Sequence, residues 1–296
     1  MILVTGATGS IGRHLVRRLR QRDIPLRALV RDPSRGRELD CAVAVGDFDD
    51  ADSIKAALRG VDQVFLCSPG AQPVQGAQPM IAQQISVIDA SIRAGVRHIV
   101  KISVRGARPS GLLAEGAHAE IEARLEASGL DWSILQPSGF MQNFLTGAGA
   151  FTSGGDLLGA YGQARVSYID CADIAACAAV LLSEDLGLHR GQRYVLTGPQ
   201  GLTHAEIAAM LSQVLGRIVS YVDQSPADFA DNLAAQGLPA GFAADVAALY
   251  AEVAGGSLAD TTSAVRDLTG RPATTFAEFL ARERDLLQEW PPRHYG

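Results

Sequence analysis

Residues 4–12 read VTGATGSIG, in which Gly6, Gly9 and Gly12 stand between a short apolar run and an amphipathic segment. A strand, a tight glycine turn and a helix in this order form the phosphate-binding unit of dinucleotide-binding folds. The first glycine allows the turn, the second lets a pyrophosphate approach the backbone, and the third lets the helix pack on the strand. We therefore expect residues 6–12 to form a phosphate loop at a helix start, with a plain glycine-rich turn as the alternative.

Short apolar runs continue along the first half of the chain and alternate with segments of helical periodicity. Continuous apolar runs suit strands that are buried on both faces, and their alternation with helices predicts parallel βαβ units. The expected fold class is α/β, with a doubly wound parallel sheet. The predicted strands cover residues 2–4, 26–30, 42–45, 64–67, 98–103 and 132–135. The predicted helices cover residues 11–19, 52–58, about 77–94 and about 116–128, the last ending at Gly129.

The pattern changes after Pro137. Residues 139–162 are rich in glycine and contain Phe140, Phe144 and Phe151, which predicts a loop that lines a cleft. Strands are expected at 166–169 and 193–196 around a helix at 172–182, followed by helices at 203–215, 226–235, 242–254 and 276–287. We expect residues 1–137, completed by 164–197, to bind the nucleotide, and residues 138–163 with 198–296 to form a smaller, mostly helical substrate lobe.

Composition excludes several classes of protein. The 296 residues are 47% hydrophobic and 20% charged, which is too apolar and too weakly charged for a disordered chain. The net charge of −6 argues against direct nucleic-acid binding and against a polybasic membrane anchor, so the expected partner is a small molecule. The four cysteines are scattered and predict reduced thiols, no metal-ligand spacing occurs, and no apolar run approaches a membrane span. A soluble, cytoplasmic protein is expected, and nothing indicates its oligomeric state.

Arg31 directly follows the second predicted strand, where dinucleotide-binding folds distinguish NAD from NADP. An acidic residue there would accept a hydrogen bond from the ribose 2′-hydroxyl, whereas a guanidinium offers several donors to a 2′-phosphate. Asp32 lies one position later, but Pro33 and Ser34 after it favour a turn-capping role. The sequence therefore favours NADP(H), with an exposed charge at a strand end as the alternative interpretation of Arg31.

Nine segments, in their order, are more specific than the glycine loop. They are ILVTGATGSIGRHLV (2–16), LRALVRDP (26–33), GDFDD (46–50), VFLCSPG (64–70), GVRHIVKISVRGA (95–107), ASGLDWSILQPSGFMQNF (127–144), YIDCADIAACAAVLL (168–182), YVLTGPQGLTHAEIAAMLSQVLGR (194–217) and GRPATTFAEFL (270–280). Together they resemble the NmrA-like branch of the atypical short-chain dehydrogenase/reductases, which includes quinone and azo reductases. The resemblance covers nearly the whole chain.

The resemblance implies a Rossmann fold, NADP(H) as cofactor and a set of cofactor contacts. Asn143 would join them at the nicotinamide end of the cleft, where it is a catalytic candidate. Gln136 departs from the family, which commonly has arginine at that position. The implied cofactor contacts are Gly6, Thr8, Gly9, Ser10, Ile11, Gly12, Arg31, Asp47, Phe48, Cys67, Ser68, Pro69, Pro137, Gly139 and Phe140.

The chain lacks the Tyr-x-x-x-Lys unit with which ordinary short-chain reductases protonate a carbonyl oxygen. Its nearest imitation pairs Tyr161 with Arg165, and an arginine cannot act as a proton shuttle. The lysine of isoflavone-reductase-like enzymes is also missing, since the helix that begins near residue 116 contains none. A classical ketoreductase mechanism is therefore disfavoured.

Three other residues bear on the chemistry of the site. His118 aligns with a histidine of quinone-reductase-like members and is a candidate for binding or protonating a substrate oxygen. Its alternative role is that of a helix-end histidine bonded to backbone. Lys101, within the fifth strand, is expected to be a cofactor or surface contact. Cys67 is interpreted as a small core residue beside the cofactor, with no catalytic role.

Two functions of different class follow. The first is an NADPH-dependent oxidoreductase that transfers hydride to a conjugated acceptor, such as a quinone, an enone, an azo compound or an aromatic biosynthetic intermediate. Such an acceptor spreads the incoming negative charge, so the protein needs mainly to position it and to donate a hydrogen bond. The second is a regulatory protein that senses NADP(H) without turnover, which the resemblance also implies because this family includes such regulators, and which the missing Tyr-x-x-x-Lys unit favours.

Overall fold

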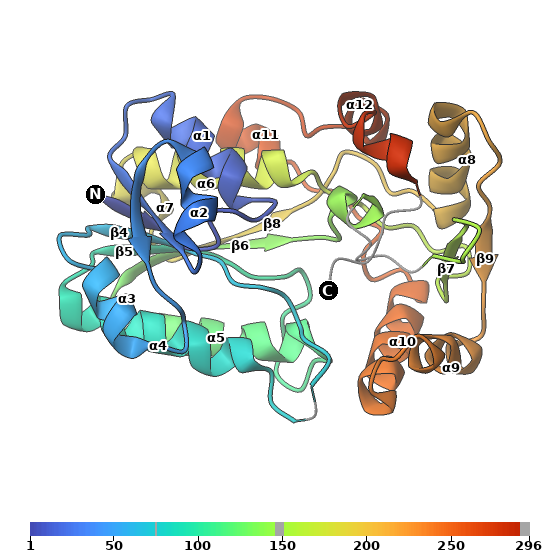
Figure 1. Cartoon of the computed structure of the whole chain (residues 1–296), viewed down its shortest axis with the longest axis horizontal. Helices are drawn as coiled ribbons and strands as arrows, with labels where there is room; N and C mark the ends of the chain where they lie inside the picture. The colour runs from blue at the N-terminus through green and yellow to red at the C-terminus, as the bar shows by residue number, and fades with distance from the viewer. Residues whose placement is uncertain (75, 146–150, 291–296) are drawn as a thin grey trace.

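A parallel sheet forms the centre of the computed structural model, which describes residues 1–74, 76–145 and 151–290 (Figure 1). Within these residues the sheet has seven strands, in the order β3-β2-β1-β4-β5-β6-β8. The order reverses between β1 and β4, and a ligand crevice is expected outside the carboxyl ends of the strands there. The strands are β1 (Ile2–Val4), β2 (Leu26–Val30), β3 (Ala42–Val45), β4 (Gln63–Leu66), β5 (His98–Ile102), β6 (Asp131–Pro137) and β8 (Gln192–Leu196).

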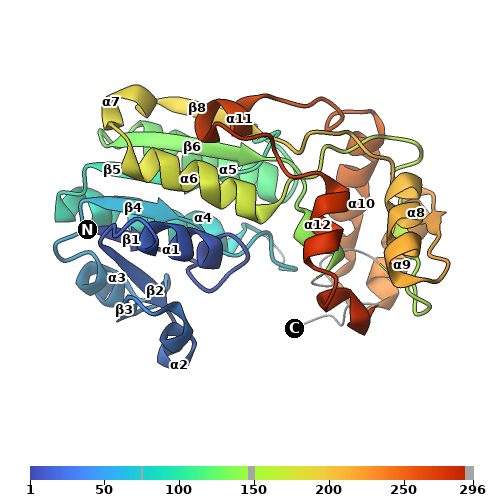
Figure 2. The same cartoon turned by 90° about the horizontal axis from the view of Figure 1, so that it is seen from above.

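Helices cover both faces of this sheet, as Figures 1 and 2 show. One face carries α1 (Gly12–Arg20), α6 (Cys171–Ser183) and α11 (Ala264–Thr269). The other carries α3 (Ala51–Ala57), α4 (Pro79–Ala94) and α5 (Ala114–Glu126). The expected α/β doubly wound fold is thereby confirmed. Short helices α2 (Pro33–Gly36), η1 (Arg37–Leu39) and α7 (Leu186–His189) fill connections.

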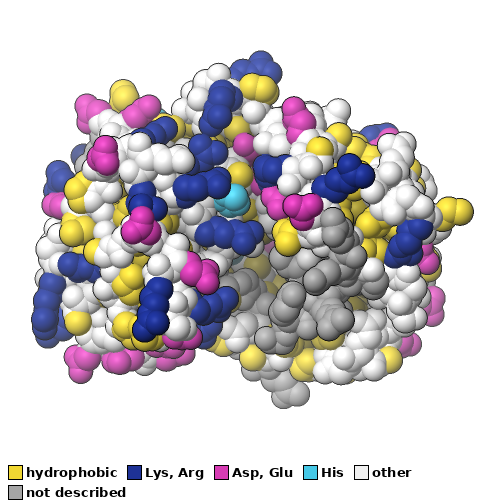
Figure 3. Space-filling view, turned by 45° about the horizontal axis from the view of Figure 1, so that its top comes forward, with side chains coloured by type: hydrophobic (Ala, Val, Ile, Leu, Met, Phe, Trp, Pro, Cys, Tyr) yellow, Lys and Arg dark blue, Asp and Glu magenta, His cyan; other side chains and the backbone are white. Residues whose placement is uncertain are grey.

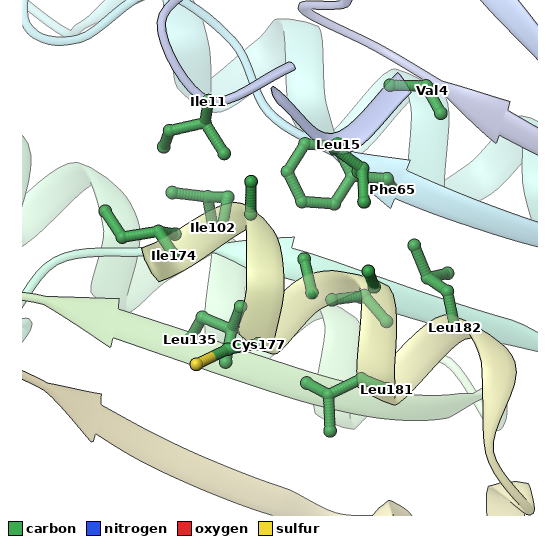
Figure 4. Close-up of a cluster of buried hydrophobic side chains, with 14 of the residues drawn as sticks. Val4, Ile11, Leu15, Phe65, Ile102, Leu135, Ile174, Cys177, Leu181 and Leu182 are labelled. Atoms are coloured by element: carbon green, nitrogen blue, oxygen red, sulfur yellow. The ribbon is translucent and has the colours of Figure 1, made fainter. Parts of the chain in front are cut away.

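The alternation of side chains along each strand divides the core into two layers. Figure 4 shows the layer between the sheet and α6, where Leu15, Phe65, Leu135 and Ile174 belong to one buried cluster. On β5, Val100 belongs to this layer, while its neighbour Ile99 belongs to the layer under α4 and α5. Because successive side chains of a strand point to opposite faces, Lys101 shares the face of Ile99.

A second group of elements gathers at one end of the sheet (Figures 1 and 2). It has its own apolar core, centred on residues such as Phe229, Phe276 and Phe279. Its elements are η2 (Met141–Phe144), the parallel pair β7 (Leu157–Gly159) and β9 (Tyr221–Asp223), α8 (His204–Leu215), α9 (Pro226–Ala235), α10 (Ala240–Ala254), α12 (Phe276–Arg282) and η3 (Leu286–Glu289). The chain also returns to the sheet between α10 and α12, because α11 packs its Val265 into the layer under α6.

A buried carboxylate ties α12 to the sheet helix α6. Asp170, the fully buried N-cap of α6, accepts hydrogen bonds from Nη1 of Arg282 at 2.6 Å and from Nε2 of Gln142 at 2.7 Å. Three residues on, Asp173 accepts from the backbone N–H of Thr274 at 2.7 Å. The first turn of α6 therefore joins the sheet to the C-terminal group of elements that contains α12.

Several predicted boundaries were wrong. Residues 166–169 do not form a strand, because Val166 bonds to Leu202 while Ser167 bonds to Leu258 and Ile169 to Gly139, which leaves only isolated bridges. Helix α5 is capped by Ala127, so Gly129 lies in the following turn, at φ +79°. The last predicted helix stops at residue 282, and β7, β9 and α11 were not predicted.

Two further features concern the described residues alone. No helix in these ranges combines the length and the apolar composition that crossing a bilayer requires. The same part of the chain holds no group of histidine, cysteine and carboxylate side chains suited to a metal ion.

Candidate active site

The glycine loop joins β1 to α1, and each of its glycines meets a different constraint. Gly6 has a φ of +60°, which side chains rarely adopt. At Gly12 a Cβ atom would lie 2.1 Å from the carbonyl oxygen of Gly6, so only glycine fits. At Gly9 a Cβ atom would meet that oxygen at 3.2 Å and no other atom within 4 Å. The space beside Gly9 is therefore open, as the approach of a ligand requires.

The backbone of this loop offers unpaired donors. Within the described ranges, the N–H groups of Ser10, Ile11 and Gly12 donate to no protein acceptor. They lie at the start of α1, where the helix dipole also favours negative charge. The loop thus fits a pyrophosphate, which would accept hydrogen bonds from these groups.

Basic side chains gather on one face of the molecule around a histidine, as Figure 3 shows. His14, in the first turns of α1, has its pKa lowered to about 4 by burial and by the charges of Arg13, Arg17 and Arg282, against the opposing charge of Asp170. Despite the net negative charge of the chain, the surroundings of α1 are therefore rich in positive charge. This local potential favours an anionic ligand at the adjacent loop.

The first cavity, of about 370 Å³, follows the carboxyl ends of β1 to β4. Arg31 lies on it and forms no ion pair or hydrogen bond within the described residues, so its guanidinium is available to a ligand. Asp32 is the N-cap of α2 and accepts from the backbone N–H of Ser34 at 2.8 Å, as expected from the turn. The predicted residues on this cavity are Gly6, Thr8, Gly9, Ser10, Ile11, Gly12, Arg31, Asp47, Phe48, Cys67, Ser68, Pro69 and Phe140.

Three polar residues of the first cavity were missed from the sequence. Gln72 and Gln83 come from the β4–α4 region, and Asp49 follows β3. The amide of Gln83 donates to both carboxylate oxygens of Asp49 at 3.1 Å, which connects α4 with the chain after β3. The GDFDD segment at 46–50 was the available signal for Asp49, whereas nothing in the sequence pointed to the two glutamines.

Cys67 lies where the first and second cavities meet. Burial raises the pKa of its thiol to about 11, against the smaller opposing effect of Lys101. The thiol is therefore protonated at neutral pH, which agrees with its interpretation as a small apolar side chain.

The second cavity, of about 330 Å³, shares Ile11, Cys67, Ser68 and Phe140 with the first. A volume in this range suits a small organic ligand. The cavity brings together four of the sequence-predicted residues, His118, Pro137, Gly139 and Asn143, from α5, β6 and η2. Residues that the sequence analysis missed also line it, namely Gly70, Ile102, Ser103, Val104, Arg105, Ala114, Glu115, Ser138, Val166, Leu249, Val253 and Leu258.

Aromatic rings form one wall of the second cavity, and they come from three separate segments. Tyr161 stacks on Tyr250 of α10 with ring centroids 4.2 Å apart, and on His204 of α8 at 3.9 Å. The hydroxyl of Tyr168 lies 2.9 Å from Nε2 of His204. All three tyrosines line the cavity. Tyr250 also stacks on Phe229, with ring centroids 5.0 Å apart, so both faces of Tyr161 and of Tyr250 are covered and these rings turn their edges to the cavity.

Of the three phenylalanines in the glycine-rich segment 139–162, only Phe140 lines the second cavity. Phe144 packs edge-on against Tyr168 and Phe276, and Phe151 packs against Trp290. These two phenylalanines therefore belong to the core of the C-terminal elements. Residues 146–150 of the segment lie outside the described part of the chain.

Tyr161 and Arg165, which have the spacing of a Tyr-x-x-x-Lys unit, do not form a catalytic pair. Arg165 donates to the carboxylate of Glu206 at 2.8 and 3.0 Å and to the carbonyl of Gly201 at 2.7 Å. Its guanidinium is therefore committed to α8 and not to Tyr161, whose ring lies against His204.

Lys101 is fully buried, so the prediction of a surface contact was wrong. Its Nζ lies 2.8 Å from Nδ1 of His118 and donates to the carbonyl of Ile102 at 3.0 Å. Burial lowers the pKa of Lys101 to about 7, with Glu122 and Cys67 opposing the shift. Burial and the neighbouring lysine lower the pKa of His118 to about 2. His118 is therefore a neutral side chain held by another side chain, not by backbone.

Comparison with known proteins was made on sequence and on structure. Residues 6–185 match a family model described as NAD(P)H-binding. An NAD(P)H azoreductase of Xenophilus azovorans is 38% identical over 283 residues, which cover 94% of this chain and 96% of that protein. Quinone oxidoreductase 2 of Escherichia coli strain K12 is 34% identical over 287 residues, covering 95% and 98%. An NADPH-dependent quinone oxidoreductase from Escherichia coli, solved with NADPH, superimposes with a TM-score of 0.82 at 32% identity, covering 95% and 99%.

Proposed function

The chain belongs to the NAD(P)H-binding family, and from this premise we propose that it is an NADPH-dependent reductase of planar conjugated acceptors, quinones or azo compounds. The full-length similarity to reductases of both kinds supports an enzyme over a sensor without turnover. Its substrate is accordingly a small molecule.

The observation that carries the proposal is the junction of the two cavities. The first holds the phosphate loop and the free guanidinium of Arg31, and the second is walled by Tyr161, Tyr168 and Tyr250. Because Ile11, Cys67, Ser68 and Phe140 line both, a dinucleotide bound along the first cavity would present its nicotinamide to the second. A flat acceptor would then lie between the nicotinamide and the edges of the tyrosine rings, a geometry that aromatic pairs favour.

Each part of the chain has a distinct task in this proposal. NADPH supplies the hydride when bound. The loop N–H groups of Ser10, Ile11 and Gly12 hold the pyrophosphate, and Arg31 binds the 2′-phosphate. Asn143 and His118 offer donors to the acceptor, while the tyrosine wall and the apolar residues of α10 exclude water. Residues 138–163 and 198–296 would form the substrate lobe, and a cytoplasmic location stays a prediction.

A panel of acceptors tests the substrate class. We expect quinones and azo dyes to consume NADPH much faster than saturated ketones, because a saturated ketone concentrates charge on one oxygen, for which a preorganised donor typically supplies about 2.7–4 kcal/mol. Steady-state rates at saturating NADPH are the measurement. Gly9→Val is the matched control, since it should lose turnover with every acceptor while the protein stays folded. Rapid reduction of saturated ketones, or NADPH binding without turnover of any acceptor, would contradict the proposal.

A further inference from the structure

We propose that Lys101 is a positioning residue that acts through His118, fixing its tautomer and renewing the proton it gives to the acceptor in the second cavity. This inference rests on the proposed reductase function and assigns the proton source that the missing Tyr-x-x-x-Lys unit leaves open. The lysine does not line either cavity, whereas the histidine lines the second.

The geometry of the pair fixes which histidine nitrogen faces the cavity. Nζ of Lys101 lies 2.8 Å from Nδ1 of His118 and, as an ammonium, can only donate to it. The ring proton of the neutral histidine is then on Nε2. Nε2 has no hydrogen-bond partner among the described residues. It is also not among the fully buried side-chain atoms without a partner, so part of its surface is accessible. A substrate oxygen or nitrogen in the second cavity can therefore accept from it.

The surroundings of the pair explain why the lysine can change its protonation state. Lys101 lies on β5 with β4 and β6 on either side and α5 packed over it. The ionisable groups that face it are Cys67 after β4 and His118 and Glu122 on α5. Glu122 is shared by Ser103, Gln136 and Arg193, so its charge is spread over several partners. Burial consequently dominates, and the amine titrates near neutral pH.

Gln136 acquires a role from the same arrangement. Its amide donates to Glu122 at 3.0 Å, from β6 to α5. An arginine at this position, as the resemblance would have it, would place a full positive charge beside Glu122 and weaken the support that Glu122 gives to a protonated lysine. The departure from the family pattern therefore fits a lysine that still binds a proton near pH 7.

The proton balance of the step closes without another reactant. Once the acceptor has gained a hydride, its oxygen or nitrogen takes the proton from Nε2 of His118, and that N–H bond breaks. Nδ1 takes a proton from the ammonium of Lys101, which becomes a neutral amine. After the product leaves, water in the cavity returns one proton by the reverse route. One acceptor, one NADPH and one proton give the reduced acceptor and NADP⁺.

The sign of the pH dependence follows from this balance. Lys101 must be protonated to act, and the protonated fraction falls as the pH rises through about 7. We expect kcat for a quinone to fall above this pH in the unaltered enzyme. In Lys101→Met we expect a kcat about tenfold lower below pH 7, which is less than the roughly hundredfold or more typical of general acid catalysis because a quinone spreads charge, and a flat profile above it. The KM for quinone and the Kd for NADPH should change little.

A second measurement does not depend on turnover. Lys55 and Lys101 are the only lysines in the chain, so a protein labelled with ¹³C on lysine side chains gives one set of signals for each. Lys55 is exposed on α3 and serves as the internal reference. We expect the Lys101 signal of the protein without cofactor to titrate near pH 7, and its midpoint to move in His118→Gln. A Lys101 signal that keeps one protonation state between about pH 5 and 10 would overturn the proposal.

Lys55→Met is the matched control, since it removes the other lysine, which is exposed and lines neither cavity, and should leave the pH profile unchanged. A Lys101→Met enzyme that keeps the inflection of kcat near pH 7 would overturn the inference while leaving the reductase function intact. An unaltered enzyme that reduces no quinone or azo compound would instead defeat the proposed function, and the NMR titration would still decide whether the two side chains are coupled.

Discussion

The first cavity takes most of its lining from short segments that directly follow β1 to β4, whereas the second combines α5, β6, α10 and the chain around residues 161–168. In the first, neighbours in sequence are neighbours in space, and one turn of backbone supplies several of the donors. In the second, Tyr161 and Tyr250 meet across 89 positions of sequence. A local motif can therefore be recognised from the sequence, whereas a surface built from distant segments cannot.

The largest expected effect is a loss of stability when Gly12 is substituted, because both the loop and the packing of α1 require that this position has no Cβ atom. Gly12→Ala would place a Cβ atom 2.1 Å from the backbone oxygen of Gly6, which cannot move aside as a side chain can. We expect it to destabilise the protein by about 3 kcal/mol or more, at or above the upper end for overpacked sites. Urea unfolding measures this.

Gly9→Ala is the control for that change, since its Cβ atom meets only one oxygen, at 3.2 Å. It should unfold close to the unaltered protein and bind NADPH more weakly. Equal unfolding free energies for the two alanine variants would show that the loop is far more adaptable than its geometry implies.

Substitution of Arg31 should have a smaller effect, which is confined to the binding of NADPH. We expect Arg31→Ala to weaken NADPH binding by about 1.5–3 kcal/mol, the value of hydrogen bonds to a charged group, and to leave NADH unchanged. Calorimetric titration of both cofactors is the measurement, and Arg35→Ala, which removes an exposed arginine of α2, is the control. Equal affinity of the unaltered protein for NADPH and NADH would refute the role given to Arg31.

The smallest expected effect is on quinone binding in the second cavity. It tests whether the two cavities bind different ligands. Tyr250→Leu keeps an apolar side chain on α10 but removes the ring that stacks on Tyr161. We expect KM for an aromatic quinone to rise by up to about tenfold, because such ring contacts contribute about 0.5–1.5 kcal/mol. The Kd for NADPH should not change. If NADPH binding weakened as much as quinone binding, the two cavities would not be separate functional units.

Much of the nucleotide-binding half was predictable because its signals are local. The order of apolar runs gave β1 to β6 within one or two residues at either end. The helix predicted at 203–215 matches α8 within one residue, and Thr203 and Glu206 form a capping box at its start. A strand at 166–169 was wrongly predicted since apolar residues there are buried without a neighbouring strand, and sequence periodicity does not distinguish these two cases.

The residues of the second cavity were predictable only where the resemblance named them. His118 and Asn143 do line it, but Phe144 and Phe151 do not, because an aromatic residue in a glycine-rich segment fits a cleft and a core equally well. Lys101 is the clearest example of a contact that the sequence could not predict. A lysine is almost never fully buried without a partner, and the partner here lies on an element 17 residues further along the chain.

The sequence by itself determined the parallel sheet, the phosphate loop and the preference for a cofactor with a 2′-phosphate, because each is signalled by short local patterns: the apolar runs, the glycine turn and Arg31 after the second strand. Only the tertiary structure decided that Lys101 meets His118, that Tyr250 of α10 joins Tyr161 and Tyr168 in one wall, and that Arg282 reaches the buried Asp170. Those contacts depend on how β5, α5, α10 and α12 pack. Packing is set by the whole core, and no short stretch of the chain encodes it.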